Sequence, residues 1–124
     1  MKIVVLKFGG TSVGSISRIQ KVAEIIKKYS KKYKVIVLSS AMSGTTNKLI
    51  NLSKKISSNF SDHEYDTLVS AGEQISCSLL SGQLIENGMK SRSWMAWQIP
   101  IITEGEHKYS RIANIKKNLK IVSK

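Results

Sequence analysis

Two short apolar runs, residues 2–8 and 34–40, organise the first third of the chain. Each run is too short for a typical helix, and β-branched side chains such as Ile3, Val4 and Val5 favour strands. Because the apolar residues are continuous rather than alternating, both runs predict strands that are buried on both faces, as in a parallel sheet.

Apolar positions between these runs recur at helical spacing and predict an amphipathic helix. Ser15 or Ser17 could cap its start, and lysines near its end suit the negative end of the helix dipole. Its expected buried face consists of Ile19, Val22, Ala23, Ile26 and Tyr29. A strand, a helix and a strand of these lengths predict a βαβ unit with parallel strands and a right-handed crossover.

The later segments predict further helices and strands, and therefore an α/β fold. In chain order we expect a helix from Asn47, a helix or helix pair at 62–87 ended by a left-handed Gly88, and a strand at 89–99. A turn region at 100–107, a short helix through Ile112, Ile115 and Leu119, and a strand at 121–122 follow.

Composition is consistent with one compact domain, because the chain has 124 residues of which 41% are hydrophobic. A formal net charge of +12 raises the question of nucleic-acid binding. The lysines are scattered through predicted helices, however, and no aromatic residues interleave with a dense basic run. We therefore do not expect nucleic acid as a partner, and the charge suits an anionic small substrate equally well.

The remaining reactive side chains give little sign of chemistry. A single cysteine, Cys77, excludes an internal disulfide, and we expect it to be buried in a helix. The two histidines, His63 and His107, are expected at the surface. With no signal peptide and no apolar run of membrane-spanning length, the sequence predicts a cytoplasmic protein without membrane contact.

The segment KFGGTSVG, residues 7–14, directly follows the first predicted strand. It is not a P-loop, because Ser15 stands where that motif requires lysine. It is not a dinucleotide-binding fingerprint either, because Thr11 interrupts the glycine pattern.

The physical chemistry of this segment nevertheless favours an anion site. Gly9 and Gly10 allow backbone amides to approach a ligand closely, while Thr11 and Ser12 add hydroxyl donors. Lys7 could neutralise a phosphate. The pattern also fits an ordinary strand-to-helix turn beside a solvated lysine, so both interpretations remain open at this point.

Two more segments extend the candidate site. SSAMSGTTN, residues 39–47, follows the second predicted strand, and parallel strands open their loops on the same edge of a sheet. Thr45 or Thr46 could instead simply cap the next helix. Glu73 lies among small and apolar residues on the third predicted helix, where a carboxylate could bind a substrate ammonium group or be solvated.

Together these segments resemble the aspartokinase family. KFGGTSV at 7–13, SSAMSGTTN at 39–47 and LVSAGEQIS at 68–76 are similar to three motifs of that family, in the same order and spacing. The resemblance covers essentially the whole chain. It implies the amino acid kinase fold, a three-layer αβα sandwich with a mainly parallel sheet.

The resemblance also implies a reaction and its residues. The reaction would transfer the γ-phosphoryl group of ATP, with Mg²⁺, to the side-chain carboxylate of L-aspartate. Lys7 would be catalytic, Ser40 and Thr46 would contact aspartate, and Glu73 would hold its amino group. The family's phosphate-binding loop corresponds to Lys7, Phe8, Gly9, Gly10, Thr11 and Ser12. No residues of this chain are assigned as metal ligands.

Family members continue well beyond this length, so we expect residues 1–124 to be the amino-terminal, substrate-side portion of a kinase domain, without its nucleotide half or regulatory domains. Three hypotheses follow: a piece of an aspartate kinase active only in a longer assembly, an inactive folded remnant, or a basic binding protein. An unpaired sheet edge could also support a homo-oligomer.

Overall fold

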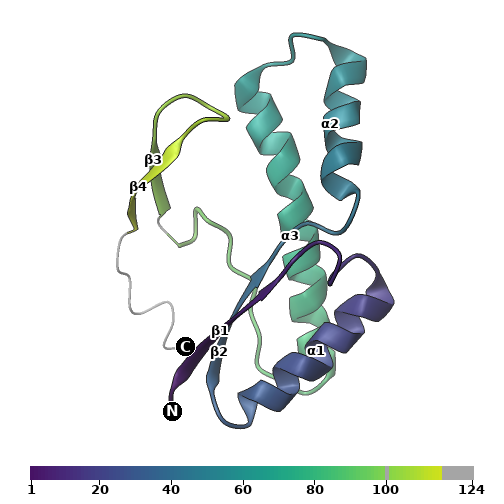
Figure 1. The fold of residues 1–124 in the computed structure, drawn as a ribbon, viewed down its shortest axis with the longest axis vertical. Coiled ribbons are helices and arrows are strands. Elements are labelled where there is room, and N and C mark those ends of the chain that lie inside the picture. The colour runs from purple at the N-terminus through teal and green to yellow at the C-terminus, as the bar shows by residue number, and fades with distance from the viewer. Residues whose placement is uncertain (100, 116–124) are drawn as a thin grey trace.

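A computed structural model describes residues 1–99 and 101–115 of the chain (Figure 1). Its elements are β1 (Ile3–Phe8), α1 (Ile16–Ser30), β2 (Lys34–Ser39), α2 (Thr45–Ile56), α3 (Asp62–Glu86), β3 (Ile101–Glu104) and β4 (Arg111–Ile115). Strands β1 and β2 form one sheet, and β3 and β4 form a separate hairpin. The βαβ unit predicted from the sequence is therefore present.

The pairing of β1 with β2 is parallel, as predicted. The register places Lys7 opposite Leu38 and Phe8 opposite Ser39, so the two strands end at the same level. The backbone amide of Ser40 donates to the carbonyl of Phe8 at 3.1 Å, one step beyond the last paired strand residues. Both following loops consequently start from one edge of the sheet.

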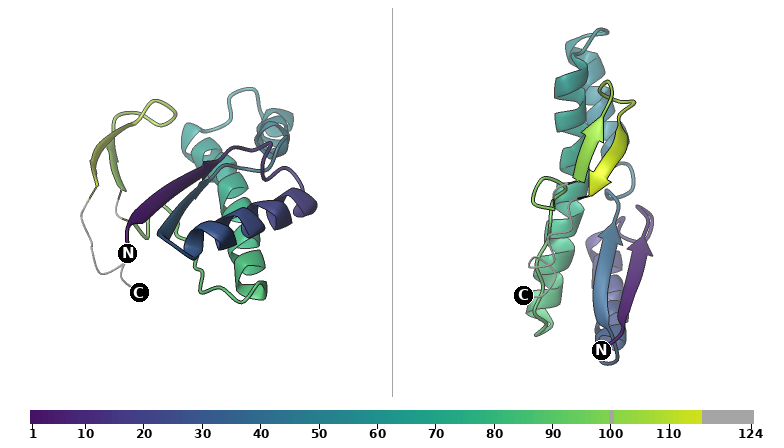
Figure 2. Two further views of the ribbon diagram at one scale, coloured as in Figure 1. Left: turned by 60° about the horizontal axis from the view of Figure 1, so that its bottom comes forward. Right: turned by 90° about the vertical axis from the view of Figure 1, so that its left-hand side faces the viewer.

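The two faces of this sheet differ in burial. Leu6, Phe8, Val35 and Val37 pack against the core that α1 and α3 form. In the right-hand view of Figure 2, α1 lies behind the sheet and α3 is seen to its left. On the opposite face Ile3, Val5, Ile36 and Leu38 are exposed. The prediction of burial on both faces is wrong for the described residues, because their helices pack on one face of the sheet.

Helix α1 begins where the sequence predicted. The Ser15 side chain caps it and accepts a hydrogen bond from the backbone amide of Arg18 at 3.3 Å. Four of the five predicted core positions are buried, while Tyr29 is exposed and was predicted wrongly. The buried four are Ile19, Val22, Ala23 and Ile26, and they form one cluster with Val13 and with Leu80 and Leu84 of α3.

The helices α2 and α3 form an antiparallel hairpin (Figure 1). The first, α2, starts at Thr45, two residues before the predicted start, because Gly44 takes the N-cap position with a φ of 78°. The predicted helix or helix pair at 62–87 is one helix of 25 residues. Gly88 follows it with a φ of +79°, in the left-handed conformation predicted for it.

The sequence-based predictions are wrong after Gly88. Residues 89–99 contain no strand, and the predicted turn region at 100–107 instead includes β3. Ile112 and Ile115 lie in β4, which pairs antiparallel with β3, rather than in a helix. The helix was predicted from apolar side chains three residues apart, and so short a pattern does not distinguish a helix from a strand. Pro100, Leu119 and the strand predicted at 121–122 lie outside the described residues.

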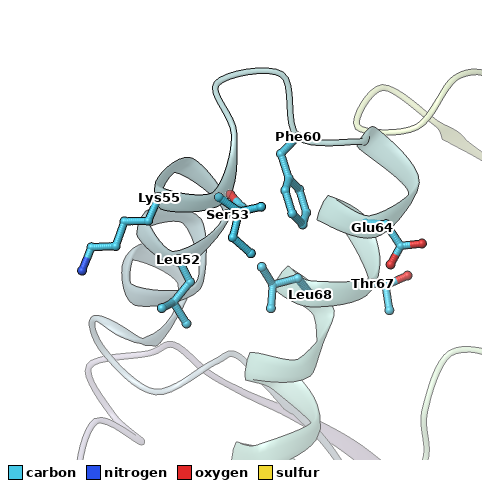
Figure 3. A pocket seen from close by; sticks show the side chains of 8 residues that line it. Leu52, Ser53, Lys55, Phe60, Glu64, Thr67 and Leu68 are labelled. Carbon is cyan, nitrogen blue, oxygen red and sulfur yellow. The ribbon is translucent and has the colours of Figure 1, made fainter.

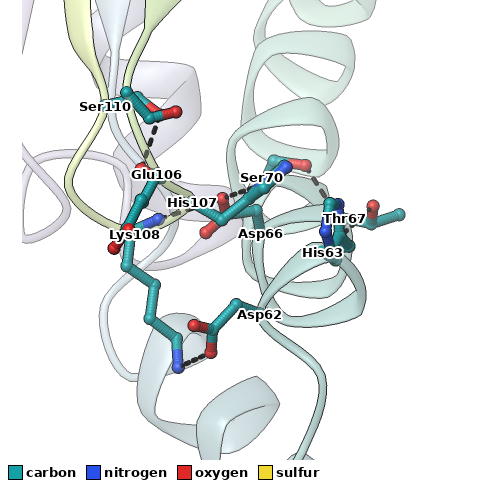
Figure 4. Close-up of polar contacts among 10 residues, drawn as sticks. Asp62, His63, Asp66, Thr67, Ser70, Glu106, His107, Lys108 and Ser110 are labelled. Carbon is teal, nitrogen blue, oxygen red and sulfur yellow. Dashed lines mark hydrogen bonds and ion pairs between the residues drawn. The ribbon is translucent and has the colours of Figure 1, made fainter.

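The β3–β4 hairpin contacts the start of α3 through polar groups (Figure 4). His107 Nδ1 lies 2.7 Å from Asp66 Oδ2, which also accepts the backbone amide of Lys108 at 3.2 Å. The hydrogen bond with His107 lowers the pKa of Asp66 below its usual value. Lys108 pairs with Asp62, and the His63 and His107 rings lie against each other with centroids 3.9 Å apart and planes tilted by 50°. Both histidines are exposed, as predicted, and their contact orients the hairpin on α3.

Two neighbouring isoleucines of α1 test how the core stabilises this fold. Ile26 is 1% exposed and Ile25 is 42% exposed. Ile26→Ala should reduce the free energy of unfolding by about 2–5 kcal/mol, because it removes buried apolar volume and leaves a cavity. Ile25→Ala should cost about 0.5 kcal/mol or less, because that side chain is exposed and its removal leaves no buried cavity. Urea denaturation measures both, and equal losses would contradict the assigned packing of α1.

Candidate phosphate and substrate site

The first loop, residues 9–14, is wound tightly after β1. The Gly9 carbonyl accepts hydrogen bonds from the backbone amides of Ser12 at 2.9 Å and Val13 at 3.3 Å. Val13 is fully buried in the core and fixes the far side of the loop, whereas Thr11 and Ser12 are exposed. The apolar side of the loop therefore holds its hydroxyl groups at the surface.

The first loop packs directly on the second loop, residues 40–44. The backbone amide of Ser43 donates to the Gly10 carbonyl at 3.1 Å. A Cβ on Gly10 would come within 2.7 Å of the Ala41 carbonyl oxygen, so only glycine allows this approach. The expectation that both loops meet at one sheet edge is confirmed.

Lys7 lies on the exposed sheet face at the carboxyl end of β1. Its Nζ is 3.8 Å from the position that a Cβ on Gly9 would occupy, so the ammonium group lies over the start of the first loop. Arg18 brings a second cation, because its Nη1 donates to the Thr11 carbonyl at 2.6 Å. Arg18 was not predicted as a site residue, although its place in the first turn of the helix after the loop was a usable signal.

Helix α3 lies against the second loop. A Glu73 carboxylate oxygen accepts a long hydrogen bond of 3.4 Å from the backbone amide of Ala41, which places Glu73 next to Ser40. Thr46 is half-buried in the first turn of α2. Neither Thr45 nor Thr46 caps that helix, because Gly44 holds the cap position without a side-chain hydrogen bond. The predicted substrate residues thus surround one loop.

Residues 2–121 match the Amino acid kinase family. The chain belongs to this family. It is 51% identical over 116 residues to an aspartokinase of Geobacillus stearothermophilus, covering 93% of this chain and 28% of that relative. It is 44% identical over 123 residues to an aspartokinase of Rickettsia felis, covering 96% of this chain and 31% of the relative.

A solved structure, that of an aspartate kinase from Synechocystis, matches this amino acid kinase chain with a TM-score of 0.67 and 45% identity. The match covers 70% of this chain and 15% of the solved one. These findings confirm the predicted αβα amino acid kinase fold, of which the described residues provide parallel strands and one helical layer. The chain spans less than a third of the length of the curated relatives it matches.

A separate apolar groove of about 500 Å³ lies at the far end of the α2–α3 hairpin (Figure 3). Leu52, Phe60 and Leu68 line it, with Lys55 and Glu64 at its margin. None of the predicted site residues contributes to it, and its apolar lining does not suit a phosphate. The groove is therefore distinct from the site at the sheet edge.

Cys77 lies one turn after Glu73 on α3 and is half-buried, so the prediction that it is buried holds only in part. Burial raises the pKa of its thiol, and the nearby charge of Glu73 raises it further. The thiol is therefore poorly suited to act as a nucleophile.

The described part of the amino acid kinase chain holds neither a membrane-spanning helix nor a cluster of metal-binding side chains. None of its helices has the length and apolar character needed to cross a membrane. Within residues 1–99 and 101–115, no group of three histidine, cysteine, aspartate or glutamate side chains could hold a metal ion.

Gly10 tests the contact between the loops. Gly10→Ala should reduce the free energy of unfolding by about 1–3 kcal/mol, because the new Cβ would meet a backbone oxygen that cannot move aside without parting the loops. Gly82→Ala is the matched control, since a Cβ there meets no heavy atom within 4 Å and Gly82 lies within α3. It should stabilise the chain by about 0.5–1 kcal/mol. Thermal unfolding of both variants measures the difference, and a neutral Gly10→Ala would contradict the close packing.

Proposed function

We propose that this chain is the amino-terminal, substrate-side portion of an aspartate kinase, which transfers the γ-phosphoryl group of ATP to the side-chain carboxylate of L-aspartate. One observation carries the proposal: the loops after two parallel strands pack together, with the Lys7 ammonium over one loop and the Glu73 carboxylate against the other. Relatives named aspartokinase, at 44–51% identity over almost the whole chain, support it.

The first loop suits the phosphates of ATP. Phe8 ends β1 and fixes where the loop starts, and Gly9 and Gly10 let the backbone come close to a ligand. The exposed hydroxyl groups of Thr11 and Ser12 add donors. This donor set of amides, hydroxyls and cations fits a triphosphate, whose oxygens would hold most of the coordination sphere of Mg²⁺.

The second loop and α3 suit aspartate. Ser40 and Thr46 offer hydroxyl groups on either side of the loop, and both are partly exposed. Glu73 is exposed and has only one long hydrogen bond to the loop, so its second oxygen can accept a substrate ammonium group. A carboxylate and a cation at opposite ends of the site would orient a zwitterionic amino acid with its side chain toward the phosphate.

In this proposal the chemistry rests on positioning and charge. The acceptor carboxylate is already a nucleophile, so no general base is required, and the distant position of His63 and His107 on the hairpin contact is consistent with that. Lys7 would neutralise negative charge on the phosphoryl group as it passes between the nucleotide and aspartate. Bound ATP supplies the phosphoryl group and its Mg²⁺ screens the phosphate charge.

A second candidate function is a folded anion-binding module without kinase activity of its own. The tightly wound first loop, its exposed hydroxyl groups and the nearby Lys7 ammonium would bind an anion without any phosphoryl transfer, which supports this alternative. The two functions differ in one requirement, because only the kinase needs the remaining part of the domain.

The activity test compares the chain alone with a chain extended by the segment of the Geobacillus stearothermophilus relative that lies beyond the matched residues. Hydroxylamine traps an acyl phosphate, so aspartyl phosphate is measured as the hydroxamate. We expect turnover only from the extended chain. An extended chain that folds and binds ATP but yields no aspartyl phosphate would support the binding module instead.

Lys7→Ala in the extended chain should lower kcat by about 100-fold or more, because it removes a cation at the position of developing charge. Lys34→Ala is the control, since Lys34 is exposed at the opposite end of β2. It should leave kcat unchanged. Equal kcat values for the two variants would exclude the role assigned to Lys7.

Glu73→Gln in the same chain should raise the KM for aspartate about tenfold or more while leaving the KM for ATP unchanged, because it removes the charge that meets the ammonium group. Glu86→Gln, at the C-terminal end of α3, is the control. A change in the KM for ATP alone would place Glu73 at the nucleotide instead of the amino acid.

A further inference from the structure

One face of a single turn of α3 packs against the second loop. Gly72, Glu73 and Ser76 all contact residues 40–45. A Cβ on Gly72 would come within 3.0 Å of Ala41 Cβ and 3.5 Å of Thr45 Cγ2, so α3 and the loop are already as close as glycine allows. The helix therefore acts as a rigid backing for the loop.

Ser76 makes the shortest polar contact in this backing. Its Oγ lies 2.6 Å from the Ser40 carbonyl oxygen and 3.1 Å from the Glu73 carbonyl oxygen, and its side chain is 0% exposed. A hydroxyl group has one proton to donate, and the shorter distance assigns it mainly to Ser40. Ser39 Oγ also approaches the Ser40 oxygen, at a longer 3.3 Å.

Two other serines show what an ordinary helical serine does in this chain. Ser53, which is 2% exposed, donates 2.8 Å to the carbonyl of Ile50, and Ser70 donates 2.9 Å to the carbonyl of Thr67. Both bonds stay within the serine's own helix. Ser76 differs because its hydroxyl leaves α3 and holds a loop that is 36 residues away in the sequence.

We propose that Ser76 is a positioning residue that sets the spacing between Ser40 and Glu73 and thereby the affinity for aspartate. This inference rests on the proposed function, in which Ser40 and Glu73 contact the amino acid. Ser76 does not touch the substrate: it lies one turn beyond Glu73 and is fully buried. Its hydroxyl joins the loop that carries one contact to the turn that carries the other.

Loss of this hydroxyl should loosen the site without removing a substrate contact. The Ser40 carbonyl would retain only the longer contact with Ser39, and the following Ala41 amide, which donates to Glu73, would move with it. Both predicted contacts with aspartate would then vary in distance. The affinity for a ligand falls when the residues of its site become ordered only on binding, because that ordering costs free energy.

The test is an NMR titration of the isotope-labelled 124-residue chain with L-aspartate, with Ser76→Ala compared to Ser53→Ala. Both substitutions remove a buried hydroxyl from a helix, but only the first removes a bond to the loop. We expect Ser76→Ala to weaken aspartate binding about tenfold and to shift the Ser40 carbonyl carbon and the Ala41 amide in the free chain. Ser53→Ala should change neither.

The outcomes separate this inference from the proposed function. If the unsubstituted chain shows no shifts with aspartate at residues 40–46 or Glu73, the aspartate-binding function is contradicted, and the inference falls with it. If it binds but Ser76→Ala binds equally well, or if Ser53→Ala weakens binding to the same extent, only the role of Ser76 is overturned.

A measurement on the unsubstituted chain decides the matter if Ser76→Ala does not fold. Saturating aspartate should move the Ser76 Cβ resonance together with the Ser40 carbonyl resonance, because they share a hydrogen bond, while the Ser53 Cβ resonance stays in place. Shifts at Glu73 without any movement at Ser76 would overturn the proposal.

Discussion

The in-register parallel pairing of β1 and β2 is the constraint on which the rest of this structure depends. It brings Phe8 level with Ser39, and the ladder continues with the hydrogen bond from Ser40 to Phe8. Both loops must then leave the sheet at one edge, where the amide of Ser43 reaches the carbonyl of Gly10. A shift of one residue would turn Lys7 to the other face of the sheet.

The second requirement is a firm support behind the loops. Val13 and α1 provide it for the first loop, since Val13 is part of the buried cluster that contains Ile19 and Leu80. Helix α3 provides it for the second loop and also belongs to that cluster. The same helix therefore carries core residues and, a turn or two away, site residues. Because the helix is rigid, the packing of its core residues fixes the position of its site residues.

Much of this could be predicted from the sequence where patterns are long or side chains have special roles. The periodicity of α1, the capping side chain of Ser15 and the left-handed Gly88 are local signals, and the structure follows them. The likeness of the loops to known motifs led to the correct family. The sequence alone could not show whether both faces of the sheet are buried. An apolar run predicts a strand, but it does not show which segments cover that strand.

The contacts of Arg18, Gly72 and Ser76 were missed for a different reason. Each depends on which backbone atoms another segment presents, and a single sequence does not contain that distance. The β3–β4 hairpin was missed because its strands have only 4 and 5 residues, and because the turn between them contacts Asp62 and Asp66, far earlier in the chain.

The central claim is that the first loop binds the phosphates and holds the second loop beside it through the hydrogen bond from Ser43 to Gly10, and titration of the ¹⁵N-labelled chain with inorganic triphosphate tests it most directly. We expect the amides of residues 9–12 and 43–45 to shift together and to yield one dissociation constant, which increases with salt. Triphosphate shifts that appear only around the lysines of α1, or that give separate constants for the two loops, would contradict it.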